Sequence, residues 1–181
     1  MTDIERIIEV LQDFKHLSRK KRRKFLTNLM FDKQFIKWLF QPEKSANLSQ
    51  LVEDMYKEFV KPHTMEALID VIEYEGYSEF NRSHATFITT ICNIAIDRNN
   101  EELKAYDAAK KDADVPRMRL RGWGDKIDNS NRLIAGLLKR SRRIVKRQAA
   151  ETARAARLPK YITKAAYTSI PETKYVDRFK I

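Results

Sequence analysis

The residues whose chemistry is plainest in this chain are arginines and lysines, gathered in the segment from 128 to 158. A guanidinium group donates paired hydrogen bonds in a planar fork that matches phosphate oxygens, and an ammonium group supplies a compact positive charge. We expect phosphate contacts from these side chains: Arg132, Lys139, Arg140, Arg142, Arg143, Lys146, Arg147, Arg154 and Arg157.

The spacing of this segment predicts one long helix. At 3.6 residues per turn its apolar residues fall on one side. These are Leu133, Ile134, Leu137, Leu138, Ile144 and Val145, with Ser141 and Gln148. Most of the cations lie opposite and span roughly 38 Å at 1.5 Å per residue, about one turn of duplex DNA. Glu151 alone offsets the row, whereas a merely solvated face usually mixes signs, so the pattern favours binding to a polyanion.

The basic helix is also compatible with a simple solubilising surface and with a helix that lies on a membrane. A membrane-bound helix requires bulky apolar residues opposite the cations. The second half of the helix has alanines there instead, which are strong helix formers. We therefore favour a nucleic acid over a membrane as the partner.

A second basic cluster covers residues 19–24, six consecutive cations. If Ser18 caps a helix here, the cations oppose the positive end of the helix dipole and repel one another. An external anion would account for them, as would an unstructured turn or a nuclear-localisation-like run. The candidate contacts are Lys20, Lys21, Arg23 and Lys24.

A third candidate is an Arg/Gly/Trp loop predicted at 113–126. In an extended segment, alternation places Arg117, Arg119 and Arg121 on one side. Trp123 stands between two glycines and has two interpretations, an aromatic ring that stacks on a base and a ring that folds back to anchor the loop. The anchoring interpretation is slightly favoured.

Composition indicates what must position these groups. The 181 residues include 43% hydrophobic residues, four glycines and five prolines, and long stretches show no period-2 alternation. We predict an all-α fold, a single helical-bundle domain of about six to eight helices with a long basic C-terminal helix and an extended C-terminal arm. Its expected parts are a near-neutral core (1–112), the loop (113–126), the basic helix (127–158) and an aromatic, basic arm (159–181).

Within the core, turn and cap residues set the expected helix ends. Thr64 and Ser83 are predicted N-caps, Asn99 or Asn100 is predicted to start a separate polar helix, and Gly76 is a predicted C-cap. The acidic residues Glu66, Asp70, Glu73 and Glu75 are interpreted as a solvent-facing side. Acid–base catalysis needs partners that are held close together and have tuned pKa values, and the spacing places no second His or Lys near His84 and Arg82. A capping or surface role is therefore preferred for His84.

Charge is localised along the chain. Residues 1–116 hold 18 Lys and Arg against 20 Asp and Glu, a net charge of −2, whereas residues 117–181 hold 18 against 5, a net charge of +13. A lone cysteine, Cys92, excludes an internal disulfide, and no apolar run of 18 residues is present. We expect an intracellular, cytoplasmic protein without cofactor or metal, although a nuclear location is compatible with the basic run.

The sequence thus predicts a non-enzymatic protein that binds a sugar-phosphate backbone, with RNA or single-stranded DNA slightly favoured over duplex DNA. The alternative is an assembly subunit of a larger nucleoprotein complex, which docks an acidic protein partner or self-associates through residues 149–181. An enzyme dependent on His84, Arg82 or Glu79 is the least favoured class.

Overall fold

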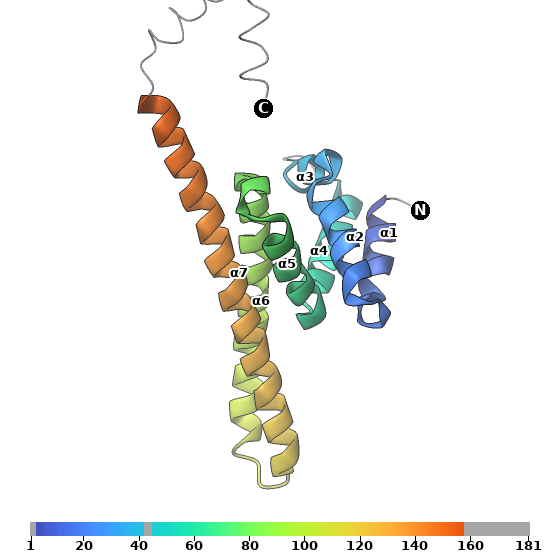
Figure 1. The fold of residues 1–181 in the computed structure, drawn as a ribbon. Helices are drawn as coiled ribbons and strands as arrows, with labels where there is room; N and C mark the ends of the chain where they lie inside the picture. The colour runs from blue at the N-terminus through green and yellow to red at the C-terminus, as the bar shows by residue number, and fades with distance from the viewer. Residues whose placement is uncertain (1–2, 42–44, 158–181) are drawn as a thin grey trace, which may run out of the picture. The chain divides into compact units, whose positions relative to one another are not determined.

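The structure, a computed structural model, describes residues 3–41 and 45–157, and there every regular element is helical (Figure 1). The predicted all-α class is confirmed. The α-helices are α1 (Asp3–Gln12), α2 (Arg19–Met30), α3 (Lys33–Leu39), α4 (Ala46–Phe59), α5 (Pro62–Glu75), α6 (Arg82–Ala109) and α7 (Arg117–Arg157), with 3-10 turns η1 (Phe14–His16) and η2 (Tyr77–Glu79). The chain divides into two compact units, Met1–Val145 and Lys146–Ile181.

Polar caps set the starts of several helices. The hydroxyl of Ser18 accepts from the backbone N–H of Lys21, so Ser18 caps α2 as predicted. Asp32 and Ser45 cap α3 and α4 in the same way. Gly76 ends α5 with φ of 81°, a left-handed conformation that a side chain disfavours, which confirms the predicted C-cap.

The prediction that Thr64 caps α5 is wrong. The helix begins two residues earlier at Pro62, whose fixed φ and missing N–H suit a first helical position, with Lys61 as N-cap. Thr64 is fully buried inside the first turn. The backbone restrictions of Pro62 therefore determine where α5 begins.

The predicted cap at Ser83 is also wrong, because Asn81 caps α6. The Asn81 side chain accepts from the N–H of His84, and Nδ1 of His84 accepts from the N–H of Asn81 at 2.9 Å. This reciprocal pair satisfies two free donors of the first turn. His84 therefore has the capping role that the sequence favoured.

The predicted break at Asn99 or Asn100 does not occur, since α6 continues to Ala109. The amide of Asn99 is used across the helix pair instead: it donates to Asn131 at 2.9 Å and accepts from the Ser130 hydroxyl at 3.0 Å. Asn99 thus binds α7 and does not cap a new helix.

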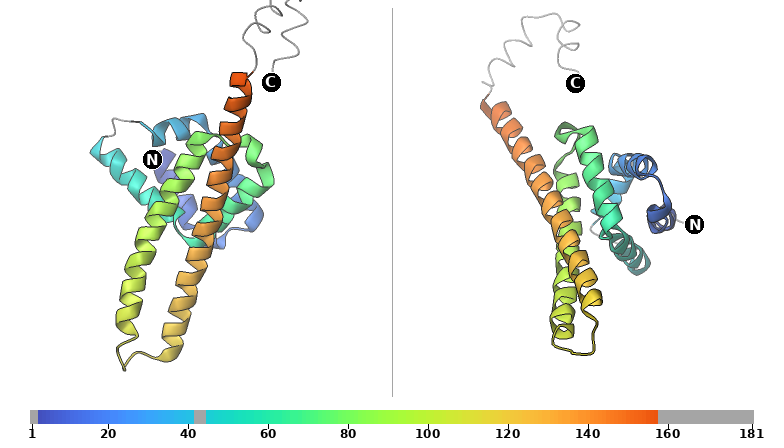
Figure 2. Two further views of the ribbon diagram at one scale, coloured as in Figure 1. Left: turned by 90° about the vertical axis from the view of Figure 1, so that its left-hand side faces the viewer. Right: turned by 60° about the horizontal axis from the view of Figure 1, so that its bottom comes forward.

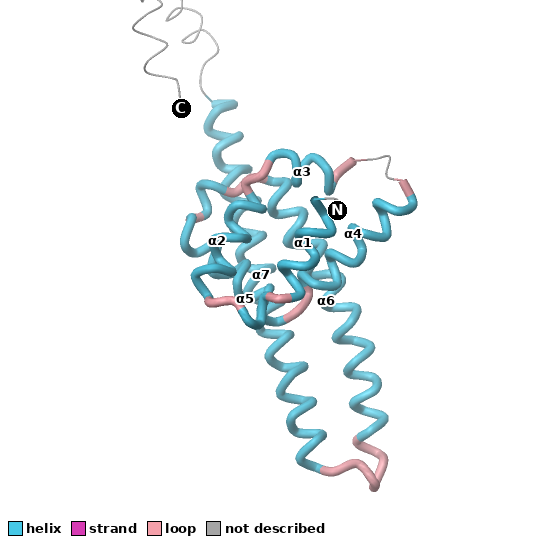
Figure 3. The backbone as a smooth tube through the Cα atoms, turned by 90° about the vertical axis from the view of Figure 1, so that its right-hand side faces the viewer, coloured by secondary structure: helices cyan, strands magenta, loops and turns pink. Residues whose placement is uncertain are grey.

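Helices α6 and α7 form an antiparallel hairpin joined by residues 110–116 (Figure 2, left). Contacts recur about every two turns along it. Ser141 donates to the carbonyl of Ala85 at 3.0 Å, and Cys92 lies 3.9 Å from the carbonyl of Ile134. The outer halves of the two helices extend beyond α1–α5 (Figures 1 and 3).

The predicted loop at 113–126 is largely wrong, because α7 begins at Arg117 and includes the Trp123 region. The indole N–H of Trp123 donates to Glu102 at 2.8 Å, and its ring packs edge-on against Tyr106 at 5.8 Å. A Cβ at Gly124 would lie 3.2 Å from the Tyr106 hydroxyl, so glycine allows this close approach. These contacts to α6 stabilise the helical conformation of the Trp123 region, which the neighbouring glycines disfavour.

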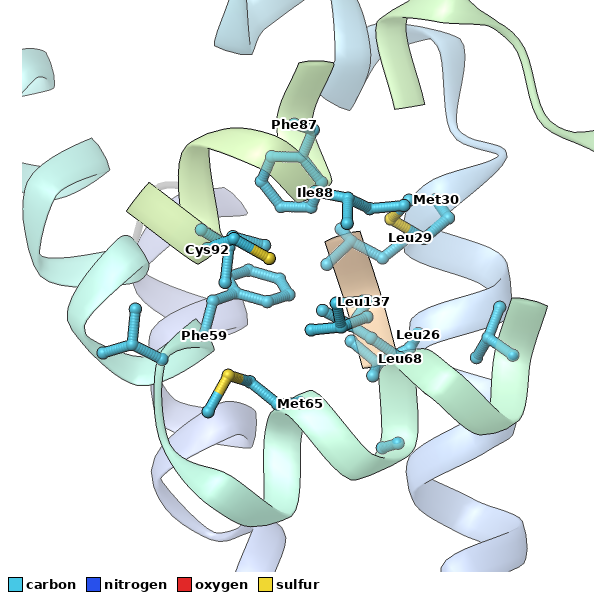
Figure 4. Packing of buried hydrophobic residues seen from close by; sticks show 14 of the residues in the cluster. Leu26, Leu29, Met30, Phe59, Met65, Leu68, Phe87, Ile88, Cys92 and Leu137 are labelled. Atoms are coloured by element: carbon cyan, nitrogen blue, oxygen red, sulfur yellow. The ribbon is translucent and has the colours of Figure 1, made fainter. Parts of the chain in front are cut away.

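One apolar core supports the first unit (Figure 4). Phe59 and Phe87 from α4 and α6 meet edge-on at 5.1 Å, and Leu68 of α5 and Leu137 of α7 are fully buried in the same cluster. Removing a large side chain from such a site typically costs about 2–5 kcal/mol. Within the first unit, the basic helix therefore packs on the bundle through its apolar side.

Candidate nucleic-acid interface

Half of the apolar stripe predicted for α7 is buried and most of the rest is partly buried, so the opposite side of the helix faces outward. Ile134, Leu137, Ser141 and Ile144 are buried. The inward position predicted for Val145 is wrong, since its side chain is 42% exposed. The buried stripe therefore ends near the end of the first unit.

The cations of α7 in the first unit lie on the outward side. Arg132, Lys139, Arg142 and Arg143 are exposed. In the described part of the chain, no acidic side chain forms an ion pair with these four residues. This side of α7 therefore offers free positive charge.

Arg140 differs from its neighbours because its side chain is hydrogen-bonded within the protein and partly buried. Its Nε donates to Glu73 of α5 at 2.8 Å, and its Nη1 donates to the carbonyl of Gly136 at 2.9 Å. Its side chain is only 22% exposed. Arg140 thus links α7 to α5, and its predicted role as a nucleic-acid contact loses support.

The basic cluster at the start of α2 also separates into two kinds of residue. Arg19 forms a two-bond pair with Asp70 of α5, both bonds 2.6 Å, and Arg22 donates to the carbonyls of Leu17 and Lys15. The candidates Lys20, Lys21 and Lys24 are exposed, and no described acidic residue pairs with them. Arg19 and Arg22 are therefore hydrogen-bonded within the protein, whereas the three lysines form no ion pair in the described chain.

Helix α5 contacts both basic helices, α2 and α7 (Figures 1 and 2). Its acidic side is therefore more than the solvent face that the sequence indicated. Asp70 pairs with Arg19 and Glu73 with Arg140. The hydrogen bond from Arg19 lowers the pKa of Asp70 below its ordinary value. These carboxylates therefore pair with cations of α2 and α7.

Two tyrosines near the end of α5 each contact an arginine, one from each basic group. The guanidinium of Arg23, from α2, lies 4.0 Å from the ring centre of Tyr74. The guanidinium of Arg143, from α7, lies 4.9 Å from the ring centre of Tyr77. Sequence patterns predicted both arginines but missed both tyrosines. The aromatic residues at positions 74 and 77, off the buried stripe of α5, were the available signal.

The third predicted group lies apart from the others. Arg117, Arg119 and Arg121 are exposed at the start of α7, and Arg121 is roughly 33 Å along the helix from Arg143 at 1.5 Å per residue. In a helix, Arg119 points to the side opposite Arg117 and Arg121, so the three arginines do not share a face. Trp123 is anchored against α6, which agrees with the interpretation favoured from sequence.

In the second unit, the described residues are the helical turns from Lys146 to Arg157. Lys146 and Arg154 are exposed, and Arg147 pairs with Glu151 at 2.5 Å. The side chain of Arg157 and the predicted arm at 159–181 lie outside the described residues. Docking of that arm stays a prediction.

His84 uses both ring nitrogens within the fold. Nδ1 accepts from Asn81, so Nε2 carries the proton and donates to the carbonyl of Met30 at 2.6 Å. Burial lowers the pKa of His84. This histidine is a structural link between α6 and α2, and its nitrogens are not free for acid–base catalysis.

Comparison with protein-family models, curated proteins and solved structures found no match to this chain. Within residues 3–41 and 45–157, no group of three or more His, Cys, Asp or Glu side chains is placed to hold a metal. Across that same part of the chain, no helix is both long enough and apolar enough to span a membrane. The arrangement of the charged and aromatic side chains therefore carries the functional inference.

Proposed function

We propose that this protein binds the sugar-phosphate backbone of a nucleic acid, RNA or single-stranded DNA in preference to duplex DNA, and has no catalytic role. The observation that carries the proposal is the free cationic side of α7, where Arg132, Lys139 and Arg142 are exposed and unpaired within the described chain. Such a surface concentrates polyanions by long-range, salt-sensitive attraction.

The spacing of these cations suits a phosphate polymer. Arg132 and Arg142 lie about 15 Å apart along the helix axis at 1.5 Å per residue, a span of a few nucleotides. Arginine forks favour paired hydrogen bonds with phosphate oxygens. Phosphate contacts position a nucleic acid without reading its sequence, so we propose little base-sequence preference from this side.

The packing of α7 favours a single-stranded ligand. The described helices that carry the cations lie along the bundle surface, and α7 packs its apolar side on the core. An α-helix reads duplex DNA by entering the major groove with base-contacting residues. Single strands and loops of RNA instead leave their backbone and bases accessible, and a cationic surface can hold them.

A charge-reversal triple variant tests the proposal. Arg132→Glu, Lys139→Glu and Arg142→Glu replace exposed residues, so helix content by circular dichroism should stay at the wild-type level. We expect the affinity for a fluorescently labelled 20-nucleotide RNA at low salt to fall at least about 100-fold, since each lost phosphate contact is worth about 1 kcal/mol or more.

The matched control carries the same charge change on other helices. Arg6, Lys33 and Lys37 on α1 and α3 are exposed, and each is replaced by glutamate. This control should keep most of the wild-type affinity. Equal losses in both triple variants, or no loss in the first, would remove α7 as the binding surface.

The assembly alternative predicts a different outcome for the purified protein. A discrete oligomer that persists after nuclease treatment, measured by light scattering, would favour docking of a protein partner or self-association through residues 149–181. Nucleic acid that co-purifies and is released by high salt would favour backbone binding.

A further inference from the structure

The end of α5 and the η2 turn that follows it carry two tyrosine rings, one exposed and one partly exposed, which contact basic residues of α2 and α7. Tyr74 is 65% exposed, an unusual position for a large aromatic ring. Gly76 turns the chain directly after the helix, and Tyr77 follows in η2. Tyr74 lies outside the core, and Tyr77 packs at its edge while staying partly exposed.

Each ring carries an arginine over its face. Arg23 lies 4.0 Å from the centre of the Tyr74 ring, and Arg143 lies 4.9 Å from that of Tyr77 and donates to its hydroxyl at 3.3 Å. The Tyr77 hydroxyl in turn donates to Glu73 at 3.2 Å. These contacts fix flat, partly exposed surfaces that combine aromatic rings with guanidinium planes.

We propose that Tyr74 and Tyr77, with Arg23 and Arg143, form a stacking platform for unpaired nucleobases, so that the ligand is a single-stranded nucleic acid held by bases as well as phosphates. This inference rests on the proposed function and narrows its ligand. Bases stack on aromatic rings and on arginine planes, and every base has a face that can do so.

The charges around the platform indicate how the strand lies, with its bases against the tyrosines and its phosphates along a flanking helix. Helix α5 carries Glu66, Asp70, Glu73 and Glu75 nearby, of which Asp70 and Glu73 are paired with arginines. Carboxylates repel phosphates, so the backbone is not expected to cross α5. Free cations lie on the flanking helices instead, Lys20 and Lys24 on α2 and Lys139 and Arg142 on α7. With its bases on the platform and its phosphates on a flanking helix, the strand keeps its phosphates away from the carboxylates of α5 and close to the free cations.

Duplexes cannot use such a platform without opening. Their base faces are stacked within the helix, and unstacking a base is unfavourable. A polyanion without bases, such as inorganic polyphosphate, gains only the ionic contacts. The platform is therefore expected to increase the affinity for a single strand, but not the affinity for a duplex or for polyphosphate.

The test uses Tyr74→Leu and Tyr77→Leu, singly and together, with Phe40→Leu as matched control because Phe40 is an exposed aromatic residue at the end of α3. Affinities are measured for 12-nucleotide poly(U), duplex RNA of equal length and polyphosphate. We expect each tyrosine variant to lose about tenfold for poly(U), the usual value of one stacked base, and little for the other two ligands. The control should match wild type.

A Tyr74→Trp variant gives a second measurement. Its fluorescence should be quenched by poly(U) beyond the change seen in wild type, and polyphosphate should not reproduce this. If the tyrosine variants bind poly(U) as wild type does, or lose polyphosphate equally, the platform is overturned. If polyphosphate and poly(U) both fail to bind wild type, the proposed function itself fails, which is a distinct result.

Discussion

Nε of Arg140 donates a 2.8 Å hydrogen bond to Oε1 of Glu73, and this bond joins the basic helix α7 to the acidic side of α5. Arg142, two residues further on, is exposed and unpaired within the described chain. Neighbouring arginines on one helix therefore have different roles: one positions the helix, and the other remains available for a ligand.

Replacing Glu73 by glutamine separates these two roles. The Arg140–Glu73 pair is half-exposed at the carboxylate, so its loss should lower the free energy of unfolding by less than about 1 kcal/mol. Removing a negative charge beside the cationic surface should raise RNA affinity about two- to threefold at low salt. Urea unfolding and polarisation titration measure the two effects. A large fall in RNA affinity would mean that Glu73 itself serves binding.

The buried His84 predicts how stability depends on pH. Burial lowers its pKa in the folded state below the ordinary value near 6.5. As pH falls below about 6.5, the unfolded chain takes up the proton first, so stability that is complete above this pH is lost toward the folded pKa. Chemical unfolding at pH 7 and pH 5 should show this loss.

The variant His84→Ala tests the assignment to this residue. It should lower the free energy of unfolding by about 2–3 kcal/mol at pH 7, because the Met30 carbonyl loses its donor, and the pH dependence should shrink. The control is His63→Ala, since burial lowers the pKa of His63 as well. If the His63 variant abolishes the pH dependence and the His84 variant preserves it, His63 is the responsible group.

The anchored Trp123 predicts a negative result in binding experiments. Its indole donates to Glu102 and its ring contacts Tyr106, so it should not stack on a base. In a Trp38→Phe background, the emission of Trp123 should stay unchanged when RNA is added. Trp123→Phe should cost about 1 kcal/mol of stability through the lost hydrogen bond and leave RNA affinity unaltered. Strong quenching by RNA would restore the stacking interpretation.

Cys92 reports on the packing of α6 against α7. Burial raises the pKa of its thiol to about 12, and the sulfur lies 3.9 Å from the carbonyl of Ile134. Since the thiolate is the reactive form, labelling with a thiol reagent at pH 8 should be at least about 100-fold slower in the folded protein than in urea. Rapid labelling without denaturant would show that the hairpin opens readily.

Sequence periodicity was sufficient for the fold class and for most of the inward side of α7, because Ile134, Leu137 and Ile144 recur at helical spacing. Local signals failed where tertiary contacts override them. Gly122 and Gly124 disfavour helix, yet Trp123 binds α6 and holds the segment helical. Asn99 has the chemistry of a cap but is used across the helix pair.

The candidate site was predictable only in part for the same reason. The cations of α7 stand out from sequence by their density, but which of them is paired depends on α5. Asp70 and Glu73 are distant in sequence from Arg19 and Arg140, and no periodicity indicates those partners. The tyrosines at 74 and 77 become candidates only when Arg23 and Arg143 are seen over their rings.

The salt dependence of RNA binding tests the central claim most directly. Wild-type protein and the Arg132→Glu, Lys139→Glu, Arg142→Glu variant are titrated against labelled 20-nucleotide RNA across a salt series that starts at low ionic strength. For single strands the slope of log affinity against log salt is about −0.7 per phosphate engaged. We predict a steep slope for wild type that becomes shallower by about 2 in the variant, since three phosphate contacts are lost. Binding with equal slopes in both proteins, or no binding by wild type at the lowest salt, would contradict the claim.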